Sequence, residues 1–166
     1  VAVEARRSPD FLIIARTDAR TSLGLDEALK RAQAYADAGA DVLFVESPET
    51  EDEMRRITAT LNKPVLANMV EGGRTPVKSP EQLQALGYRL AIFPVTALLA
   101  GAAAMQRAYA RLLQGRIDEP GDPTGATGAN GTIDPADPAL MPFADMTRLM
   151  GFEDVWAFER RHAQDE

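Results

Sequence analysis

The chain has 166 residues, of which 45% are hydrophobic and 26% charged, so it is long enough for one globular core of ordinary composition. Its formal net charge is −7 and no run of Lys or Arg forms a basic stripe, which excludes nucleic acid as a partner. The chain has no cysteine, and no apolar stretch approaches the roughly 20 residues that span a bilayer, so we expect a soluble, cytoplasmic protein without disulfides or a membrane partner.

Four short apolar runs predict β-strands. They are continuous and rich in Val, Ile and Leu, as strands buried on both faces of a parallel sheet should be. The runs are residues 11–15, 42–46, 64–68 and 90–94. Helical patterns lie between and after them. Two helices open at the capping boxes 50–53 and 79–82, and another spans residues 96–114. The helix at 25–38 carries an apolar stripe on one face: Ala28, Leu29, Ala32, Tyr35 and Ala36. This alternation predicts an α/β fold with four βα units in residues 1–116.

The last third of the chain has a different character. Residues 117–142 are rich in Gly and Pro and predict an irregular connection. Residues 143–166 return to helical periodicity, with Trp156 and Phe158 on the apolar side of the final helix. These helices must pack either on the body of their own chain or on a neighbouring subunit.

Polar side chains follow three of the predicted strands. Arg16 and Asp18 come after the first strand, Glu46 ends the second and Asn68 ends the third. Ligands in parallel α/β folds gather at the carboxyl ends of the strands, where the loops converge. We therefore predict a common site for an anionic, oxygen-rich substrate at this end of the sheet.

Each candidate also has a structural interpretation. Arg16 could pair with Asp18 or Glu46, although a guanidinium is a natural bidentate partner for a carboxylate or phosphonate. Asp18 is better explained as a residue that holds the loop or orients Arg16. Glu46 could form a salt bridge, or it could act as an acid or base or lie next to the ligands of a metal ion. His162 is the only histidine and lies in a charged tail, where we expect a solvated side chain.

Three blocks of sequence resemble a known family. "DFLIIARTDA", "GLDEALKRAQAYADAGADVLFVESP" and "KPVLANMVEGGRTP", with "MPFADMTRLMGFEDVWAFERR" near the end, resemble the isocitrate lyase and phosphoenolpyruvate mutase superfamily, in particular its small methylisocitrate lyase-, dimethylmalate lyase- and oxaloacetate decarboxylase-like members. The resemblance implies the C-terminal half of a (β/α)8 TIM-type barrel plus C-terminal helices. It also implies that the magnesium ligands and a Lys-Lys-Cys-Gly-His loop belong to a first half preceding Val1, so we expect no metal ligand in this chain.

The resemblance also implies roles for individual residues. Arg16 matches the arginine that grips a substrate carboxylate or phosphonate, Glu46 matches a strand-end catalytic glutamate, and Asn68 matches a residue that binds the polar end of the substrate. The pocket-lining loop is represented by three residues: Glu71, Gly72 and Thr75.

Two departures from the methylisocitrate lyase pattern narrow the expected substrate. Leu99 and Val70 stand where those enzymes carry an arginine and a threonine, which argues against a tricarboxylate. We expect, in the complete protein, a magnesium-dependent C–C lyase or decarboxylase that acts on a small 2-oxo or 2-hydroxy dicarboxylate through an enolate.

Two alternatives remain open. One is C–P bond chemistry on a phosphonate, as a mutase or hydrolase, because the same arginine would serve. The other is that the chain by itself is an inactive half-barrel or an assembly module. The family resemblance further implies a homo-oligomer in which subunits exchange a C-terminal helix.

Overall fold

The computed structural model describes residues 1–115 and 140–162. The chain divides into two compact units, Val1–Leu99 and Ala100–Glu166. The predicted irregular connection at 117–142 lies outside the described residues except for its last three positions, which are neither helix nor strand.

The first unit contains four parallel strands in chain order. They are β1 (Ile14–Thr17), β2 (Val42–Val45), β3 (Leu66–Asn68) and β4 (Leu90–Ile92). β1 pairs with β2 and β3 pairs with β4, and a single parallel bridge between Leu43 and Val65 joins β2 to β3. All pairings are parallel, as the buried apolar runs predicted.

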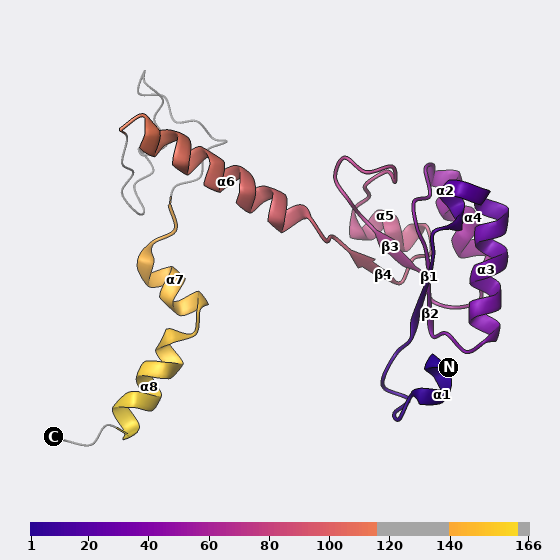
Figure 1. Ribbon diagram of the computed structural model, residues 1–166, viewed down its shortest axis with the longest axis horizontal. Coiled ribbons are helices and arrows are strands. Elements are labelled where there is room, and N and C mark those ends of the chain that lie inside the picture. The colour runs from indigo at the N-terminus through magenta and orange to yellow at the C-terminus, as the bar shows by residue number, and fades with distance from the viewer. Residues whose placement is uncertain (116–139, 163–166) are drawn as a thin grey trace. The chain divides into compact units, whose positions relative to one another are not determined.

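Helices alternate with the strands (Figure 1). The helices of the first unit are α1 (Ala2–Ala5), α2 (Ala19–Leu23), α3 (Leu25–Asp37), α4 (Glu51–Thr60) and α5 (Pro80–Ala85). α6 (Thr96–Leu113) begins in this unit, and α7 (Phe143–Leu149) and α8 (Phe152–His162) belong to the second. The short helix α2 was not predicted.

One face of the strands is covered by helices and carries the main core. Successive side chains of a strand point to opposite faces, so Leu43 and Val45 lie on one face of β2 and Phe44 on the other. The Leu43 face packs against α3 and α4, which lie on the same side of β1 and β2 in Figure 1. The apolar stripe predicted for α3 is confirmed, since four of its residues are buried and a fifth packs against the core: Ala28, Leu29, Ala32, Ala36 and Tyr35.

The opposite face of the strands is largely uncovered within the described residues. Its small apolar cluster consists of Val42, Phe44 and Leu66. On the flanking strands, Ile14 of β1 and Ile92 of β4 are 47% and 40% exposed. Burial on both faces was therefore the wrong expectation for β1 and β4. Each of them has a strand neighbour on one side only in the described structure, whereas β2 lies between two strands and is buried throughout.

The first strand lies further along the chain than the predicted 11–15. Phe11 and Leu12 are 69% and 58% exposed, and β1 begins only where Ile14 comes opposite Val42. A strand extends as far as its partner offers hydrogen-bonding groups, not as far as its own apolar run. As a result, Arg16 lies within β1 instead of after it.

The two predicted capping boxes differ in outcome. At Ser79, both reciprocal hydrogen bonds with Gln82 are present, and Pro80 occupies the first turn of α5. At Thr50, the side chain accepts from the backbone N–H of Glu53, but the carboxylate of Glu53 instead accepts from the backbone N–H of Glu49 and from a distant arginine. Only half of that box is formed.

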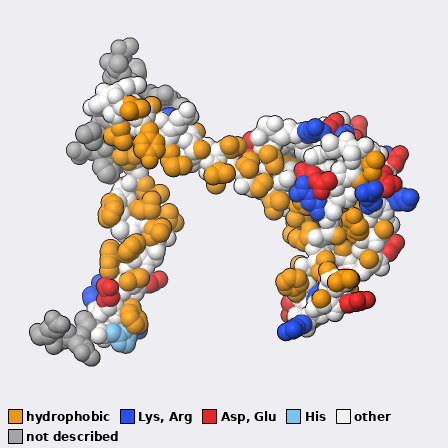
Figure 2. Space-filling view, in the orientation of Figure 1, with side chains coloured by type: hydrophobic (Ala, Val, Ile, Leu, Met, Phe, Trp, Pro, Cys, Tyr) orange, Lys and Arg blue, Asp and Glu red, His pale blue; other side chains and the backbone are white. Residues whose placement is uncertain are grey.

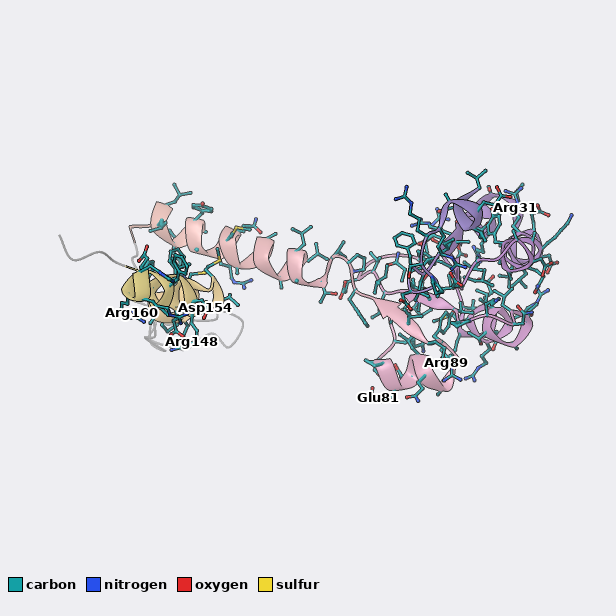
Figure 3. All side chains as sticks on the ribbon, turned by 90° about the horizontal axis from the view of Figure 1, so that it is seen from below. Arg31, Glu81, Arg89, Arg148, Asp154 and Arg160 are labelled. Carbon is teal, nitrogen blue, oxygen red and sulfur yellow. The ribbon has the colours of Figure 1, made fainter. Side chains whose placement is uncertain are left out.

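The second unit exposes many large apolar side chains on α7 and α8, which Figure 2 shows as hydrophobic surface along these helices. The rings of Phe152 and Trp156 contact each other in a tilted arrangement, with a centroid distance of 5.9 Å and an interplanar angle of 45°. Arg148, labelled in Figure 3, pairs with Asp145 and Glu153. None of the helices in the described ranges combines the length and apolar character that crossing a bilayer requires.

Candidate active site

Three of the predicted site residues, Arg16, Glu46 and Asn68, gather on the uncovered face at the carboxyl ends of the strands. Arg16 of β1 lies directly opposite Phe44 of β2 in the parallel register. Glu46 follows β2 and comes two residues after Phe44, so the two side chains point to the same face. Asn68 is the last residue of β3. Alternation along the strands thus brings three polar groups together on one surface above an apolar base.

Arg16 is the centre of this cluster. Its Nε and Nη2 donate to the two carboxylate oxygens of Asp18 at 3.0 and 2.7 Å, and its Nη2 lies 3.4 Å from Oε2 of Glu46. The guanidinium carbon stands 5.0 Å from the ring centroid of Phe44, within the range of a cation–π contact. The side chain is still 49% exposed, so it remains accessible to a ligand.

The Arg16–Asp18 pair shifts the titration of both groups. The hydrogen bonds from Arg16 lower the pKa of Asp18 below that of an ordinary carboxyl, and the hydrogen bonds to Asp18, helped by the charge of Glu46, raise the pKa of Arg16. Asp18 holds one edge of the guanidinium through these hydrogen bonds, and the orienting role expected for it stays a prediction.

Glu46 is more enclosed than Asp18, the other carboxylate that contacts Arg16. Its side chain is 17% exposed, its Oε1 accepts from the hydroxyl of Ser47 at 3.2 Å, and its Oε2 accepts from Nδ2 of Asn68 at 3.4 Å. The side-chain oxygen of Asn68, Oδ1, is buried and has no hydrogen-bond partner among the described residues. A buried acceptor without a donor is costly, so this atom requires a water or a ligand donor.

The loop after β3 is brought near the site only in part. Thr75 and Asn68 line the same small cavity, of about 10 Å³, which is close to the least that admits one water. Gly72 has a positive φ of 75° in the turn closed by the hydrogen bond from Gly73 N–H to the carbonyl of Val70. Glu71 accepts a hydrogen bond from the hydroxyl of Thr96, which lowers the pKa of Glu71.

Comparison with known proteins identifies the family. Residues 1–113 match the phosphoenolpyruvate phosphomutase family. The chain belongs to this family. The recognition of the isocitrate lyase and phosphoenolpyruvate mutase superfamily from the sequence blocks is thereby confirmed.

Named relatives share both sequence and fold with this phosphomutase-family chain. It is 43% identical over 162 residues to a 2,3-dimethylmalate lyase of Eubacterium barkeri, covering 98% of the chain and 51% of that protein. A structure of oxaloacetate acetylhydrolase in complex with the product oxalate matches with a TM-score of 0.74 at 29% identity, over 93% of this chain and 48% of that one. A phosphonopyruvate hydrolase complex with oxalate and Mg²⁺ matches with a TM-score of 0.72 at 26% identity, over 98% and 53%. The chain thus spans about half the length of these relatives.

The described part of this phosphomutase-family chain does not form a metal centre. Within residues 1–115 and 140–162, no three His, Cys, Asp or Glu side chains come together in a way that could hold a metal ion. The carboxylates nearest the site are already bound to Arg16 by the contacts given above. These residues therefore do not fit Mg²⁺ by themselves.

The structure adds residues that the sequence did not single out. Phe44 and Ser47 contact Arg16 and Glu46, and both could have been inferred from their positions two residues before and one after Glu46. Arg20, in α2, forms an ion-pair network with Glu49 and Glu53. No local signal predicts this network, because its partners are about 30 residues away.

Proposed function

We propose that, in the complete protein, this chain supplies the carboxylate-binding side of the active site of a carbon–carbon lyase or decarboxylase for a small 2-oxo or 2-hydroxy dicarboxylate. The observation that carries the proposal is the Arg16–Glu46–Asn68 cluster on the uncovered face of the strands. The names of the relatives, a 2,3-dimethylmalate lyase and an oxaloacetate acetylhydrolase, support this substrate class.

The same proposal accounts for the uncovered face of the strands. Four parallel strands in chain order, with helices on one face, form half of a (β/α)8 barrel. In a closed barrel the uncovered face would become the interior, and the carboxyl ends of the strands would become the catalytic end. The exposed Ile14 and Ile92 would then be covered by the other strands.

Arg16 would bind and orient one carboxylate of the substrate. Asp18 occupies the Nε–Nη2 edge of the guanidinium, so the Nη1 side is the one that remains for a substrate oxygen. Because Nη2 of Arg16 lies 3.4 Å from Oε2 of Glu46, a substrate bound at this guanidinium would have the Glu46 carboxylate close by. Orientation of this kind is a large part of catalysis.

Glu46 would act as the base for a 2-hydroxy acid. Its carboxylate would take the hydroxyl proton, the O–H electron pair would form the new carbonyl, and the C–C bond would break with its electrons passing to the enolate of the departing fragment. Ser47 and Asn68 hold the two oxygens of Glu46 in place by the hydrogen bonds described above. The enolate of the departing fragment would then take up a proton, either directly from the protonated Glu46 or through water, and Glu46 would return to its carboxylate form.

We further propose that the complete protein uses Mg²⁺ held by ligands outside the described residues, as the phosphonopyruvate hydrolase complex with oxalate and Mg²⁺ supports. When bound, Mg²⁺ would supply Lewis-acid stabilisation of the enolate oxygen. It follows that the 166-residue chain alone should be inactive, and that activity should require the complete protein.

A phosphonate substrate is the second candidate, because the fold matches a phosphonopyruvate hydrolase and a guanidinium binds phosphonate as readily as carboxylate. Assaying the complete protein with 2,3-dimethylmalate, oxaloacetate and phosphonopyruvate separates the two. Turnover of phosphonopyruvate alone would favour the second candidate and reject the first.

The direct test is Arg16→Lys in the complete protein. A lysine keeps the charge but loses the fork, so we expect kcat/KM for the active dicarboxylate to fall by about 100-fold. The matched control is Arg31→Lys on α3, an exposed arginine paired with Glu27 and labelled in Figure 3, which should leave kcat/KM unchanged. Retained affinity and turnover in both Arg16→Lys and Arg16→Ala would reject the proposed role of Arg16.

A further inference from the structure

The loop that carries Glu46 has an unusual backbone. Ser47, directly after Glu46, has a φ of 58°, in the left-handed region that non-glycine residues seldom occupy. Such a conformation costs free energy and persists only where surrounding contacts impose it. The hydrogen bond from Ser47 to Glu46 does not do so alone, because both groups belong to the same short loop.

Arg20 provides the contacts that hold this loop from outside. Its Nη1 lies 2.5 Å from Oε1 of Glu49, and its Nη2 and Nε donate to the two oxygens of Glu53 at 2.8 and 3.1 Å. Glu53 in turn accepts from the backbone N–H of Glu49 at 2.7 Å. All three nitrogens of the guanidinium therefore bind the segment that follows Glu46.

Arg20 belongs to the segment that directly follows Arg16 in the chain. It is the second residue of α2, which begins directly after Asp18, the partner of Arg16. The side chain is only 15% exposed, so its ion pairs are less screened by solvent than ordinary surface pairs. One arginine thus connects the loop after β1 with the loop after β2.

The network extends to the third loop of the site. Nη1 of Arg74, in the loop after β3, lies 3.7 Å from the Glu49 oxygen that Arg20 also binds. Arg74 is 61% exposed and this contact is long, so it adds little free energy by itself. It shows, however, that Glu49 lies where the segments that follow β1, β2 and β3 come together.

We propose that Arg20 is a positioning residue, which sets the distance between Arg16 and Glu46 by clamping the Glu46–Glu49 loop through Glu49 and Glu53. This inference rests on the proposed function for its effect on turnover, but its structural part stands independently. A displacement of about 1 Å in a catalytic group can lower a rate by about 100-fold. Lysine at position 20 cannot bind two carboxylates with three nitrogens, so the loop should relax.

The test compares Arg20→Lys with Arg6→Lys in the complete protein. Arg6 is a matched control, because it also forms a partly buried ion pair: its Nη1 lies 2.7 Å from Oδ2 of Asp41. This pair lies at the amino end of β2, the end opposite Glu46. Both substitutions should lower stability to a similar degree. Only Arg20→Lys should speed amide hydrogen exchange in residues 46–50 and lower kcat, by about tenfold or more, while KM changes by less.

The outcomes separate the two proposals. If the unmodified protein turns over none of the three substrates, the proposed function fails, and hydrogen exchange still decides the role of Arg20. If Arg20→Lys leaves exchange in residues 46–50 unchanged, or if Arg6→Lys lowers kcat equally, the positioning role is overturned. A stability loss in both variants with unchanged kcat in both would also overturn it, since Arg20 would then be merely structural.

Discussion

At the scale of single residues, Glu53 receives three donors on one carboxylate. Two come from Arg20 and one from the backbone N–H of Glu49, and the hydrogen bond from Arg20 is the main cause of the lowered pKa of Glu53. We expect Glu53→Gln to reduce the free energy of unfolding by about 1–2 kcal/mol at neutral pH, because it removes charge-assisted hydrogen bonds from a mostly enclosed group. Urea unfolding of the two proteins measures this difference.

The pH dependence of that difference has a defined sign. Because the native pKa of Glu53 lies below the ordinary value of about 4.3, its contribution to stability is present above the ordinary value and is lost as the pH falls through the lowered native value. The stability gap between wild type and Glu53→Gln should therefore close in strong acid. A gap that stays constant down to pH values where all carboxyls are protonated would contradict the ionic contribution. Glu27→Gln, at an exposed helix pair, should show only a small gap at any pH.

The candidate site could be predicted from the sequence as far as its residues follow a strand. Arg16, Glu46 and Asn68 come together because parallel strands bring their carboxyl ends to the same edge of the sheet. Arg20 could not be found in this way, since Glu49 and Glu53 become its neighbours only after β1 and β2 have paired. Glu53 was instead predicted to complete a local capping box, and a distant cation displaced that local interaction.

At the scale of elements, the end of α5 depends on a glycine that no other residue can replace freely. Gly87 has a φ of 94°, and a Cβ there would come within 3.0 Å of Cβ and Oγ1 of Thr58 on α4. The hydroxyl of Thr58 meanwhile donates to the carbonyl of Leu86, so Thr58 cannot move away without losing that bond. We expect Gly87→Ala to destabilise the first unit by about 2–3 kcal/mol, from backbone strain and steric overlap together.

Gly24 provides the control for the backbone part alone. It has a φ of 87° between α2 and α3, and a Cβ there would meet nothing within 4 Å. Gly24→Ala should therefore cost about 1 kcal/mol, the strain of a left-handed alanine. Thermal unfolding of both variants measures the two losses of stability. Equal losses would show that steric overlap with Thr58 does not contribute to the cost of Gly87→Ala.

The elements themselves were predicted well where local chemistry determines them and less well where pairing does. The stripe of α3 and the Ser79 capping box depend on residues within a few positions of one another, and both were found. The start of β1 was misplaced because Phe11 and Leu12 extend the apolar run beyond the point where β2 offers a partner. An apolar run indicates that a segment is suited to burial but not which neighbour will bury it.

At the scale of the whole molecule, the uncovered strand face and the helices α7 and α8 expose more large apolar side chains than an isolated chain should tolerate. On the strand face, Ile92 is 40% exposed and lies beside Asn68 in the register of β3 and β4. On α8, Trp156 and Phe158 are 42% and 62% exposed. These surfaces are suited to contact with other protein segments, and we propose that the complete protein is a homo-oligomer in which α8 packs on a second copy.

The 166-residue chain on its own should therefore self-associate, and sedimentation velocity over a wide concentration range should show a mass that rises with concentration. Ile92→Lys should weaken the association, because it places a charge on the uncovered face without disturbing the helix-covered core. Gln84→Lys, at an exposed position of α5, adds the same charge elsewhere and should leave the association unchanged. A monomer at every concentration would contradict the expected self-association. Equal effects of the two lysine substitutions would show that the association responds to net charge, because only a contact through the strand face distinguishes position 92 from position 84.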